Sequence, residues 1–244
     1  MKPTVYGIIL AGGNGSRMKL QGVNKVTSEF KNKPLIYYGV ELLNGIVEKT
    51  VIVIGAYAES VKKCLQSYQV EYVVQKERLG TAHATQCGLN ILPHDSSSII
   101  IVGYGDHMMY YQKKTIQKLI QNHIDDKVEL TFVTSYYDDI NSLAYGRILR
   151  DKKGCLIGII EQKDASEKEK NITEFNAGLY CFNYTFLKES LPKIKLSPIS
   201  HEYYLTDLIK LGIQEGKKVY VYKVPFHEVG VGINRQEDFL LNNI

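Results

Sequence analysis

The stretch VYGIILAGGNGSRM, residues 5–18, joins an apolar run to a loop that holds three glycines and an arginine. The run VYGIIL is predicted to be a buried first strand of a sheet. A glycine-rich loop after such a strand exposes backbone N–H groups that can bind phosphate oxygens. The stretch therefore predicts an α/β fold with a phosphate-binding loop, and it leaves the kind of phosphate ligand open.

The loop matches neither of two common phosphate-binding patterns. A dinucleotide loop reads G-x-G-x-x-G, and Met18 stands where its third glycine belongs. No acidic residue ends the next predicted strand, TVIVIGA (50–56), where a ribose would be bound, and the pattern G-x-x-x-x-G-K-[ST] does not occur. Two nearby cations, Arg17 and Lys25, suit a triphosphate, although a plain turn with two surface charges is the simpler alternative.

Predicted strands and helices alternate through the first half of the chain. Strands are expected at 50–56, 70–75, 97–106 and 128–137, and amphipathic helices at 34–43, 58–68, 80–92 and 113–124. Pro34 is expected to be the first residue of its helix. This order predicts a mostly parallel sheet with helices on both faces.

The second half predicts a small β-rich insertion. Residues 145–165 alternate around a DKKG turn and are expected to form a hairpin. A strand at 176–183, a helix at 203–216 and a strand at 217–225 follow, whereas 164–171 is expected to be a charged loop or helical turn. The sequence shows no repeat and no linker, so we expect a single domain.

Composition excludes several classes of function. No apolar run approaches the roughly 18–20 residues that span a membrane, and the N-terminal sequence does not resemble a signal peptide. A formal net charge of +4 without a basic, aromatic-rich run gives no indication of nucleic-acid binding. The four cysteines are scattered without metal-ligand spacing, so we expect buried, reduced thiols and a cytoplasmic protein.

Further segments follow the glycine loop in a fixed order. They are QKERLGTAHA (75–84), GYGD (103–106), YGRILRD (145–151), GIIEQKDASEKEKNITEFNAGLYCF (158–182), HEYYLTDLI (201–209) and VGVGIN (229–234). Together with LAGGNGSRM and Lys25, the series resembles the sugar-nucleotidyltransferases, and among them the pyrophosphorylase domain of bacterial bifunctional N-acetylglucosamine-1-phosphate uridylyltransferases. The resemblance covers nearly the whole chain.

The resemblance implies a Rossmann-like, three-layer α/β/α nucleotidyltransferase fold with a mixed, mostly parallel central sheet and a small β-rich insertion. It implies one domain over residues 1–244, with a nucleotide-binding half at about 1–136 and a sugar-phosphate-binding half at 137–244. The hexapeptide-repeat acetyltransferase domain of the bifunctional enzymes is not in the sequence, so we expect no acetyltransferase activity. Their trimer is not assumed either, and the sequence indicates no oligomeric state.

The resemblance also implies roles for particular residues. Those implied to contact the nucleotide are Leu10, Ala11, Gly12, Gly13, Gln75, Gly80, Thr81, Tyr104 and Gly105, with Gln75, Gly80 and Thr81 at the base. The implied catalytic residues are the phosphate-binding cations Arg17 and Lys25, together with Asp106. Asp106 and Asn234 match ligands of Mg²⁺, the implied cofactor, and the sugar-phosphate pocket is expected to contain Gly146, Glu161, Asn176 and Tyr204.

The expected chemistry agrees with these residue types. A phosphate oxygen of a sugar 1-phosphate attacks the α-phosphorus of a nucleoside triphosphate, and pyrophosphate leaves. Because attacker and target are both anionic, catalysis requires charge neutralisation and positioning, and no nucleophilic side chain. One carboxylate and one amide oxygen suffice as protein ligands for Mg²⁺, which keeps several waters. The expected partners are these two small molecules, without nucleic acid or a membrane.

Several of these residues also have simpler interpretations. Asp106 could cap a helix at 107–114, because aspartate is a preferred N-cap residue. Asn176 could simply begin a strand, and Glu161 could be a surface charge. His83 is interpreted as structural rather than catalytic, and the aromatic pair at 203–204 could either wall the sugar site or pack in the core.

The sequence departs from the family pattern at four points. LAGG at 10–13 stands where the acetylglucosamine enzymes more often have LAAG, and it is commoner in glucose-1-phosphate uridylyl- and thymidylyltransferases. Asn24 replaces a usual proline, GDHMMY at 105–110 lacks the proline that normally follows the aspartate, and the acetyltransferase part is missing. UTP and N-acetylglucosamine 1-phosphate are the expected substrates. The alternatives are another sugar phosphate (glucose, galactose), another nucleotide (dTTP, CTP), or a non-catalytic nucleotide-sugar-binding regulator.

Overall fold

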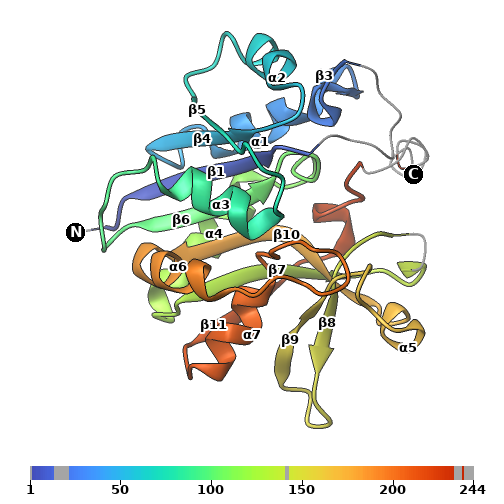
Figure 1. Cartoon of the computed structure of the whole chain (residues 1–244). Helices are drawn as coiled ribbons and strands as arrows, with labels where there is room; N and C mark the ends of the chain where they lie inside the picture. Colours follow the sequence, from blue (N-terminus) through green and yellow to red (C-terminus); the bar gives the residue numbers. More distant parts are fainter. Residues whose placement is uncertain (1, 14–21, 141–142, 234–237, 239–244) are drawn as a thin grey trace.

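One large mixed sheet forms the centre of the computed structural model, which describes residues 2–13, 22–140, 143–233 and 238. Its main path runs in the order β11–β7–β10–β6–β1–β4–β5. These strands are β1 (Val5–Ala11), β4 (Lys49–Ile54), β5 (Glu71–Val74), β6 (Ile99–Tyr104), β7 (Leu130–Tyr136), β10 (Glu174–Asn183) and β11 (Val219–Lys223). Figure 1 shows the sheet running through the whole molecule.

Most neighbouring strands are parallel. β5, β4, β1 and β6 are parallel to one another, β11 is parallel to β7, and β10 is antiparallel to both β6 and β7. The predicted mixed, mostly parallel sheet is therefore confirmed. Because β1, β5 and β6 end at the same edge, the segments that follow them lie close together.

Two small β elements complete the described strands. β2 (Glu29–Phe30) pairs with β3 (Lys33–Pro34), and β8 (Arg147–Arg150) pairs with β9 (Leu156–Ile160) as the predicted hairpin. The β8–β9 hairpin joins the main sheet through one register pair, Phe175 with Arg147. In Figure 1 it projects away from the sheet.

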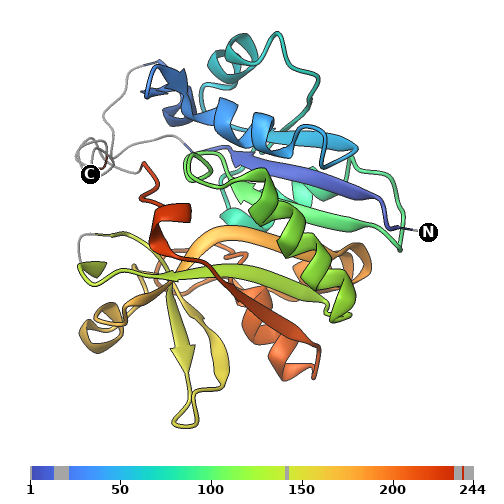
Figure 2. The same cartoon turned by 180° about the vertical axis from the view of Figure 1, so that it is seen from behind.

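Helices cover both faces of the sheet. They are α1 (Leu35–Leu43), α2 (Ala58–Cys64), α3 (Thr81–Leu89), α4 (Lys113–Asp125), α5 (Glu167–Lys170), α6 (Tyr184–Ser190) and α7 (Asp207–Gln214), with 3-10 turns at Lys25–Thr27, Leu191–Lys193 and Phe226–Glu228. Ile9 of β1 belongs to a buried cluster with residues of α1, α2 and α4, whereas Ile8 belongs to a second cluster with residues of α3, α6 and α7. Figures 1 and 2 show these two helical layers on opposite faces, which confirms the predicted three-layer fold.

Some local predictions need correction. Pro34 is the N-cap of α1 and pairs in β3, so the helix begins one residue later than predicted. The helix expected from residue 203 begins only at Asp207, because the backbone of Tyr203 bonds to another segment. Of the two alternatives for 164–171, the structure has a helical turn, α5. A capping box of Ser166 and Glu169 stabilises its N-terminus.

The four cysteines all lie within the described residues and are free thiols. They were expected to be buried, but Cys155 is exposed in the β8–β9 turn, and only Cys181 is fully buried. The exposure of Cys155 follows from the projection of the hairpin. No helix in the described part of the chain has the length and apolar character that crossing a membrane requires.

Candidate active site

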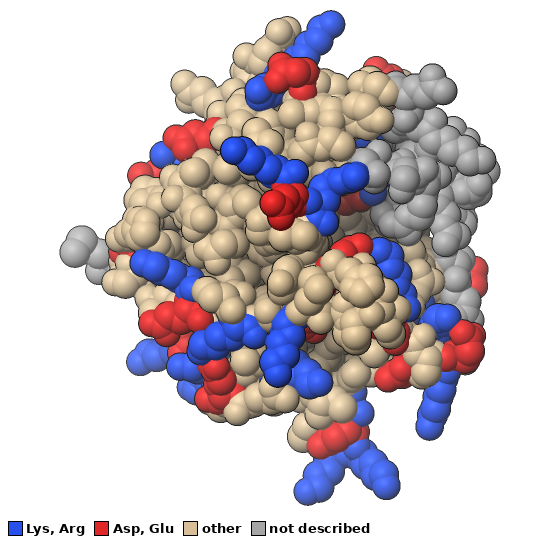
Figure 3. All heavy atoms as spheres, in the orientation of Figure 1, with Lys and Arg blue, Asp and Glu red and all other residues tan. Residues whose placement is uncertain are grey.

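A cavity of about 550 Å³ opens at the carboxyl edge of the sheet and receives residues from both halves of the chain. Twelve residues predicted for the site line it: Leu10, Gly12, Gly13, Gln75, Gly80, Thr81, Tyr104, Asp106, Gly146, Glu161, Asn176 and Tyr204. Figure 3 shows the hollow on this face, bordered by atoms of both Lys/Arg and Asp/Glu. Ligands of open α/β sheets bind at this edge.

Gln75 lies across the end of β1. It is 6% exposed, and its Nε2 donates to the carbonyl of Gly80 at 3.0 Å. A Cβ added at Gly12 would lie 2.8 Å from Oε1 of Gln75, so the glycine leaves room for this amide. His83 holds the same loop, since its Nδ1 lies 2.9 Å from the carbonyl of Glu77 and 3.2 Å from Nε2 of Gln75. These contacts agree with the structural interpretation of His83.

The loop before α3 packs directly against the segment at 203–205. Gly80 has a φ of 105°, and a Cβ there would lie 2.5 Å from the carbonyl oxygen of Tyr203. Tyr203 N–H donates to Leu79 at 2.7 Å, and Ala82 N–H donates to the carbonyl of Tyr203 at 2.9 Å. Leu205 N–H donates to Oγ1 of Thr81 at 2.9 Å. This junction, which we call the 79–82/203–205 junction, joins the two halves beside the cavity.

Asp106, which lines the cavity, forms an ion pair with Lys25. Their side chains are 17% and 14% exposed. Burial by itself would raise the pKa of Asp106, but the charge and hydrogen bond of Lys25 outweigh burial and hold that pKa below its ordinary value. Helix α4 begins only at Lys113, with Gln112 as its N-cap. Asp106 therefore does not cap this helix, and it presents an ionised carboxylate to the cavity.

Asn24, which directly precedes Lys25, hydrogen-bonds to the backbone at the start of the glycine loop. Its side chain is 1% exposed, and Nδ2 lies 2.9 Å from the carbonyl of Ala11, 3.1 Å from that of Gly13 and 2.8 Å from that of Ala56. A proline, usual here in the family, could make none of these contacts. The departure from the pattern thus has a structural role that the sequence analysis did not foresee.

Glu161 and Gly146 form part of the opposite wall. Glu161 follows β9 directly, and its Oε1 accepts from Oγ1 of Thr206 at 2.7 Å. A Cβ added at Gly146 would lie 3.4 Å from both carboxylate oxygens of Glu161. Burial raises the pKa of Glu161, and Asp207 adds to the rise, against the hydrogen bond from Thr206. Glu161 is therefore not the surface charge that the simpler interpretation proposed.

Asn176 lies within β10 at an irregularity of the strand. The register with β7 shifts between Asn176 and Tyr180, and Gly178 there has a φ of 68°. Nδ2 of Asn176 donates to the Tyr180 hydroxyl at 2.6 Å, and that hydroxyl lies 3.1 Å from the hydroxyl of Tyr104. The irregularity thus places Asn176 in a polar network that reaches Tyr104 at the end of β6.

Some predicted residues lie elsewhere. Ala11 is buried in β1, and Gly105 packs against Ile36, so neither lines the cavity. Arg17 and Asn234 lie outside the described residues. Tyr203 contributes its backbone to the junction, whereas Tyr204 lines the cavity and is 8% exposed. Burial raises the pKa of Tyr204 to about 12.

Further lining residues were missed by the sequence analysis. They are Arg78, Ala84, His107, Ala144, Tyr145, Gln162, Lys163 and Glu202. Most of them are neighbours of predicted residues in the quoted motifs, and this proximity in the sequence could have identified them as lining residues. His107 stacks on Tyr145 with ring centroids 4.9 Å apart, and burial lowers its pKa to about 4. It is therefore neutral at pH 7.

The oxygen ligands that the cavity offers suit Mg²⁺. Among the described residues, no three His, Cys, Asp or Glu side chains gather to hold a metal ion. Mg²⁺ commonly takes only one or two carboxylates from a protein and completes its shell with phosphates and water. The ionised carboxylate of Asp106, facing a cavity of this size, fits that requirement.

Comparisons with known proteins identify the family of the chain. The chain matches the family model described as nucleotidyl transferase over residues 6–227. Bifunctional protein GlmU of Carboxydothermus hydrogenoformans is 39% identical over 229 residues, which cover 93% of this chain and 50% of that protein. The same-named protein of Geobacillus thermodenitrificans is 37% identical over 232 residues, 94% of this chain and 49% of its own. The chain spans about half the length of these curated relatives.

A solved structure has the same fold. A Bacillus anthracis protein described as a glucose-1-phosphate thymidylyltransferase, in complex with sucrose, superposes with a TM-score of 0.75 and covers 98% of this chain and 94% of its own. Its sequence identity of 19% shows the fold alone. The family model and the bifunctional relatives confirm the resemblance inferred from the motifs, and the chain belongs to the nucleotidyl transferase family.

Proposed function

We propose that the chain is a Mg²⁺-dependent nucleotidyltransferase that joins N-acetylglucosamine 1-phosphate to UTP and releases pyrophosphate. The observation that carries the proposal is one cavity with Gln75 and Asp106 on one wall and Glu161 and Asn176 on the other. The motifs shared with the bifunctional uridylyltransferases support the choice of substrates.

The nucleotide is proposed to bind at the ends of β1, β5 and β6. Nε2 of Gln75 is already engaged with the Gly80 carbonyl, so its Oε1 remains to accept from the uracil N–H. Backbone N–H groups after β1 and the ammonium of Lys25 would contact the phosphates. A bound Mg²⁺ would neutralise phosphate charge here, held by Asp106 and by Asn234 of the matching motif.

The sugar phosphate is proposed to bind at the opposite wall. The Glu161 carboxylate would accept from sugar hydroxyls, and Asn176 would supply an amide beside it. The attacking phosphate oxygen forms a bond to the α-phosphorus, and the bond to pyrophosphate breaks. The protein positions two anions and lowers their repulsion, without a covalent intermediate.

Pyrophosphate release tests the proposal. The purified protein is assayed with Mg²⁺ and every pairing of UTP, dTTP and CTP with the 1-phosphates of N-acetylglucosamine, glucose and galactose. We expect UTP with N-acetylglucosamine 1-phosphate to react fastest. A different fastest pair would replace the proposed substrates and keep the chemistry. Nucleotide-sugar binding without release from any pair would instead make the chain a regulator.

Asp106→Ala is the matching variant test. Removing this carboxylate is expected to lower turnover by about 100-fold or more while the protein remains folded, because the group proposed to hold Mg²⁺ at the phosphates is lost. Asp125→Ala, at the exposed end of α4, is the control and should keep full turnover. Near-full activity of folded Asp106→Ala would contradict the metal assignment.

A further inference from the structure

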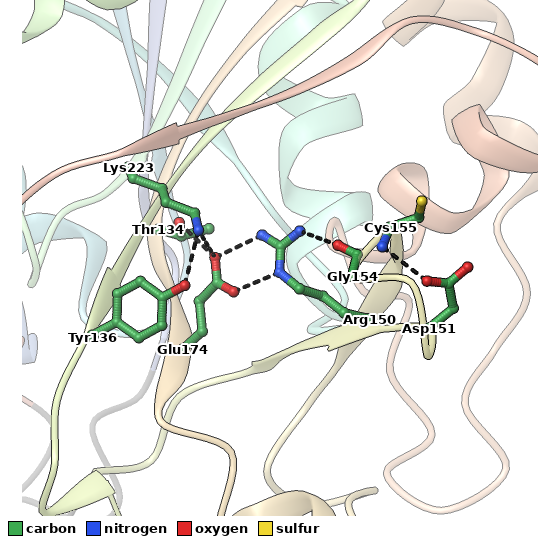
Figure 4. Close-up of polar contacts among 8 residues, drawn as sticks. All are labelled: Thr134, Tyr136, Arg150, Asp151, Gly154, Cys155, Glu174 and Lys223. Carbon is green, nitrogen blue, oxygen red and sulfur yellow. Dashed lines mark hydrogen bonds and ion pairs between the residues drawn. The ribbon is translucent and has the colours of Figure 1, made fainter.

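A polar cluster lies in the second half of the chain, outside the cavity lining (Figure 4). We call it the Glu174 cluster, and it consists of Thr134, Tyr136, Arg150, Glu174 and Lys223. Glu174 is 5% exposed, and Arg150 donates two hydrogen bonds to its carboxylate, from Nε at 2.7 Å and from Nη2 at 2.8 Å. Oγ1 of Thr134 donates to the same carboxylate at 3.2 Å.

The cluster joins four strands. Arg150 ends β8, Glu174 begins β10, Thr134 lies in β7, and Lys223 ends β11. Nζ of Lys223 lies 3.8 Å from the Glu174 carboxylate and donates to the Tyr136 hydroxyl at 2.9 Å. Burial alone would raise the pKa of Glu174, but Arg150 outweighs burial and keeps that pKa low.

Apart from the Arg150–Glu174 contact, the β8–β9 hairpin meets the main sheet by backbone pairing and by Ile148 and Ile159, which belong to the same buried cluster as residues of β10. One register pair links it to β10, and the Asn176 N–H donates to the Gly146 carbonyl at 2.9 Å. Helix α7 packs on β9, with the side chain of Lys210 against Gly158. The Arg150–Glu174 contact therefore supplies a directional, two-pronged link at the end of β8 that lies farther from Gly146.

The same elements carry the sugar-side wall of the cavity. Gly146 directly precedes β8, Glu161 directly follows β9, and Asn176 stands two residues after Glu174 on β10. Because Gly146 and Glu161 adjoin this register pair, a tilt of the hairpin at its Arg150 end would change their orientation relative to Asn176. Displacements of about 1 Å in such positions are enough to weaken catalysis or binding strongly.

We propose that Arg150 and Glu174 are positioning residues for the sugar-phosphate wall, with Lys223 as a weaker support. The proposal rests on the proposed function of the cavity. Arg150 acts through its planar fork, which holds β8 at one angle to β10, and not through its charge alone. The nucleotide wall is built on β1, β5 and β6, and none of these strands carries a residue of the Glu174 cluster.

Kinetics of three variants test the proposal. Arg150→Lys keeps the charge and loses the fork, and Glu174→Gln keeps the shape and loses the charge. We expect either change to raise the KM for the sugar 1-phosphate by about tenfold, with the KM for the nucleotide changed by less than about twofold. Lys193→Met, which removes an exposed ion pair to Glu215, is the control and should change neither KM.

A purely structural ion pair gives a different result. It would lower the melting temperature and leave both KM values of the folded variants unchanged. Unchanged sugar KM in folded Arg150→Lys and Glu174→Gln, or an equal rise in both KM values, would overturn the proposal.

Amide hydrogen exchange tests the same link without substrates. In Glu174→Gln, amides of β8 and β9 should exchange at least about fivefold faster than in the wild type, while amides of β1 and β6 keep their rates. Unchanged exchange of the hairpin in the folded variant would also overturn the proposal. Absence of pyrophosphate release in the wild type is a separate result, which would refute the proposed function and leave this measurement valid.

Discussion

Glu161 is a half-buried acid whose charged form makes the folded protein less stable at neutral pH. Its pKa is raised above the ordinary value of 4.5, first by burial and then by neighbouring carboxylates such as Asp207. The folded state therefore favours the protonated form. The resulting stability is fully present below pH 4.5 and is lost as the pH rises through the folded-state pKa.

Glu161→Gln should accordingly be more stable than the wild type at pH 7, because a neutral amide keeps the bond to Thr206 without the charge. The difference in free energy of unfolding should shrink towards pH 4.5, as measured by urea denaturation at both values. The same variant should bind the sugar phosphate more weakly. An equal stability difference at both pH values would show that the charge of Glu161 has no such effect.

Arg147 is a second residue whose role follows from burial. Its side chain is fully buried, and its guanidinium donates to the backbone carbonyls of Ile140, Leu143, Tyr145 and Lys170. These carbonyls belong to the segments that surround the start of β8. The arginine therefore replaces regular backbone pairing with side-chain hydrogen bonds.

Arg147→Met should destabilise the protein by about 3–5 kcal/mol, because several buried carbonyls lose their donor at once. Chemical denaturation measures the change. Lys152→Met, in the exposed turn of the same hairpin, is the control and should cost less than about 0.5 kcal/mol. A loss below about 1 kcal/mol for Arg147→Met would mean that water satisfies these carbonyls.

Among the elements, the 79–82/203–205 junction gives the sharpest stability test. Gly80→Ala should lower the free energy of unfolding more than Gly154→Ala does, although both glycines have positive φ values, 105° and 82°. A Cβ at Gly154 meets nothing within 4 Å, whereas one at Gly80 meets the Tyr203 backbone. We expect about 1 kcal/mol for Gly154→Ala and about 3 kcal/mol for Gly80→Ala, measured by denaturation. Equal losses of stability in the two variants would show that the junction accommodates the added Cβ without strain.

The sequence predicts elements better than it predicts contacts between them. A continuous run of isoleucine and valine located β6, which is buried on both faces, and helical periodicity located α4, which buries one face. The helix start at 203 was wrong because the apolar pattern continues through Tyr203 and Tyr204, while the backbone there pairs with Leu79 and Ala82. A tertiary hydrogen bond of this kind leaves no periodic signal.

For the site, motif order brought together residues that spacing alone could not. Lys25 and Asp106 are separated by 81 positions, and only the family pattern suggested that they share a function. The roles of Asn24 and Arg147 were not predicted, because a buried amide or guanidinium looks like a surface residue in a sequence. Their partners are backbone carbonyls, which every residue has, so the sequence does not show which of them will be bound.

At the scale of the whole molecule, the cavity has walls from both halves, so a ligand that spans it should stabilise both together. UTP and sugar phosphate at concentrations near 100 times their Kd should each add about 2.7 kcal/mol to the free energy of unfolding. Thermal denaturation in a non-reactive combination, such as UTP without Mg²⁺ plus sugar phosphate, measures the effect. If the nucleotide stabilises the protein and the sugar phosphate does not, the sugar-side wall does not bind the sugar phosphate.

The projection of the hairpin also makes one of its residues accessible to chemical labelling. Cys155 is the exposed thiol in its turn, whereas Cys64 and Cys87 are partly covered and burial raises their pKa values. Thiolates react and thiols do not, so a maleimide dye should attach first at Cys155. The unmodified sequence therefore accepts a fluorescent reporter at the tip of the β8–β9 hairpin, and rotation of the hairpin becomes measurable without introducing a single new cysteine.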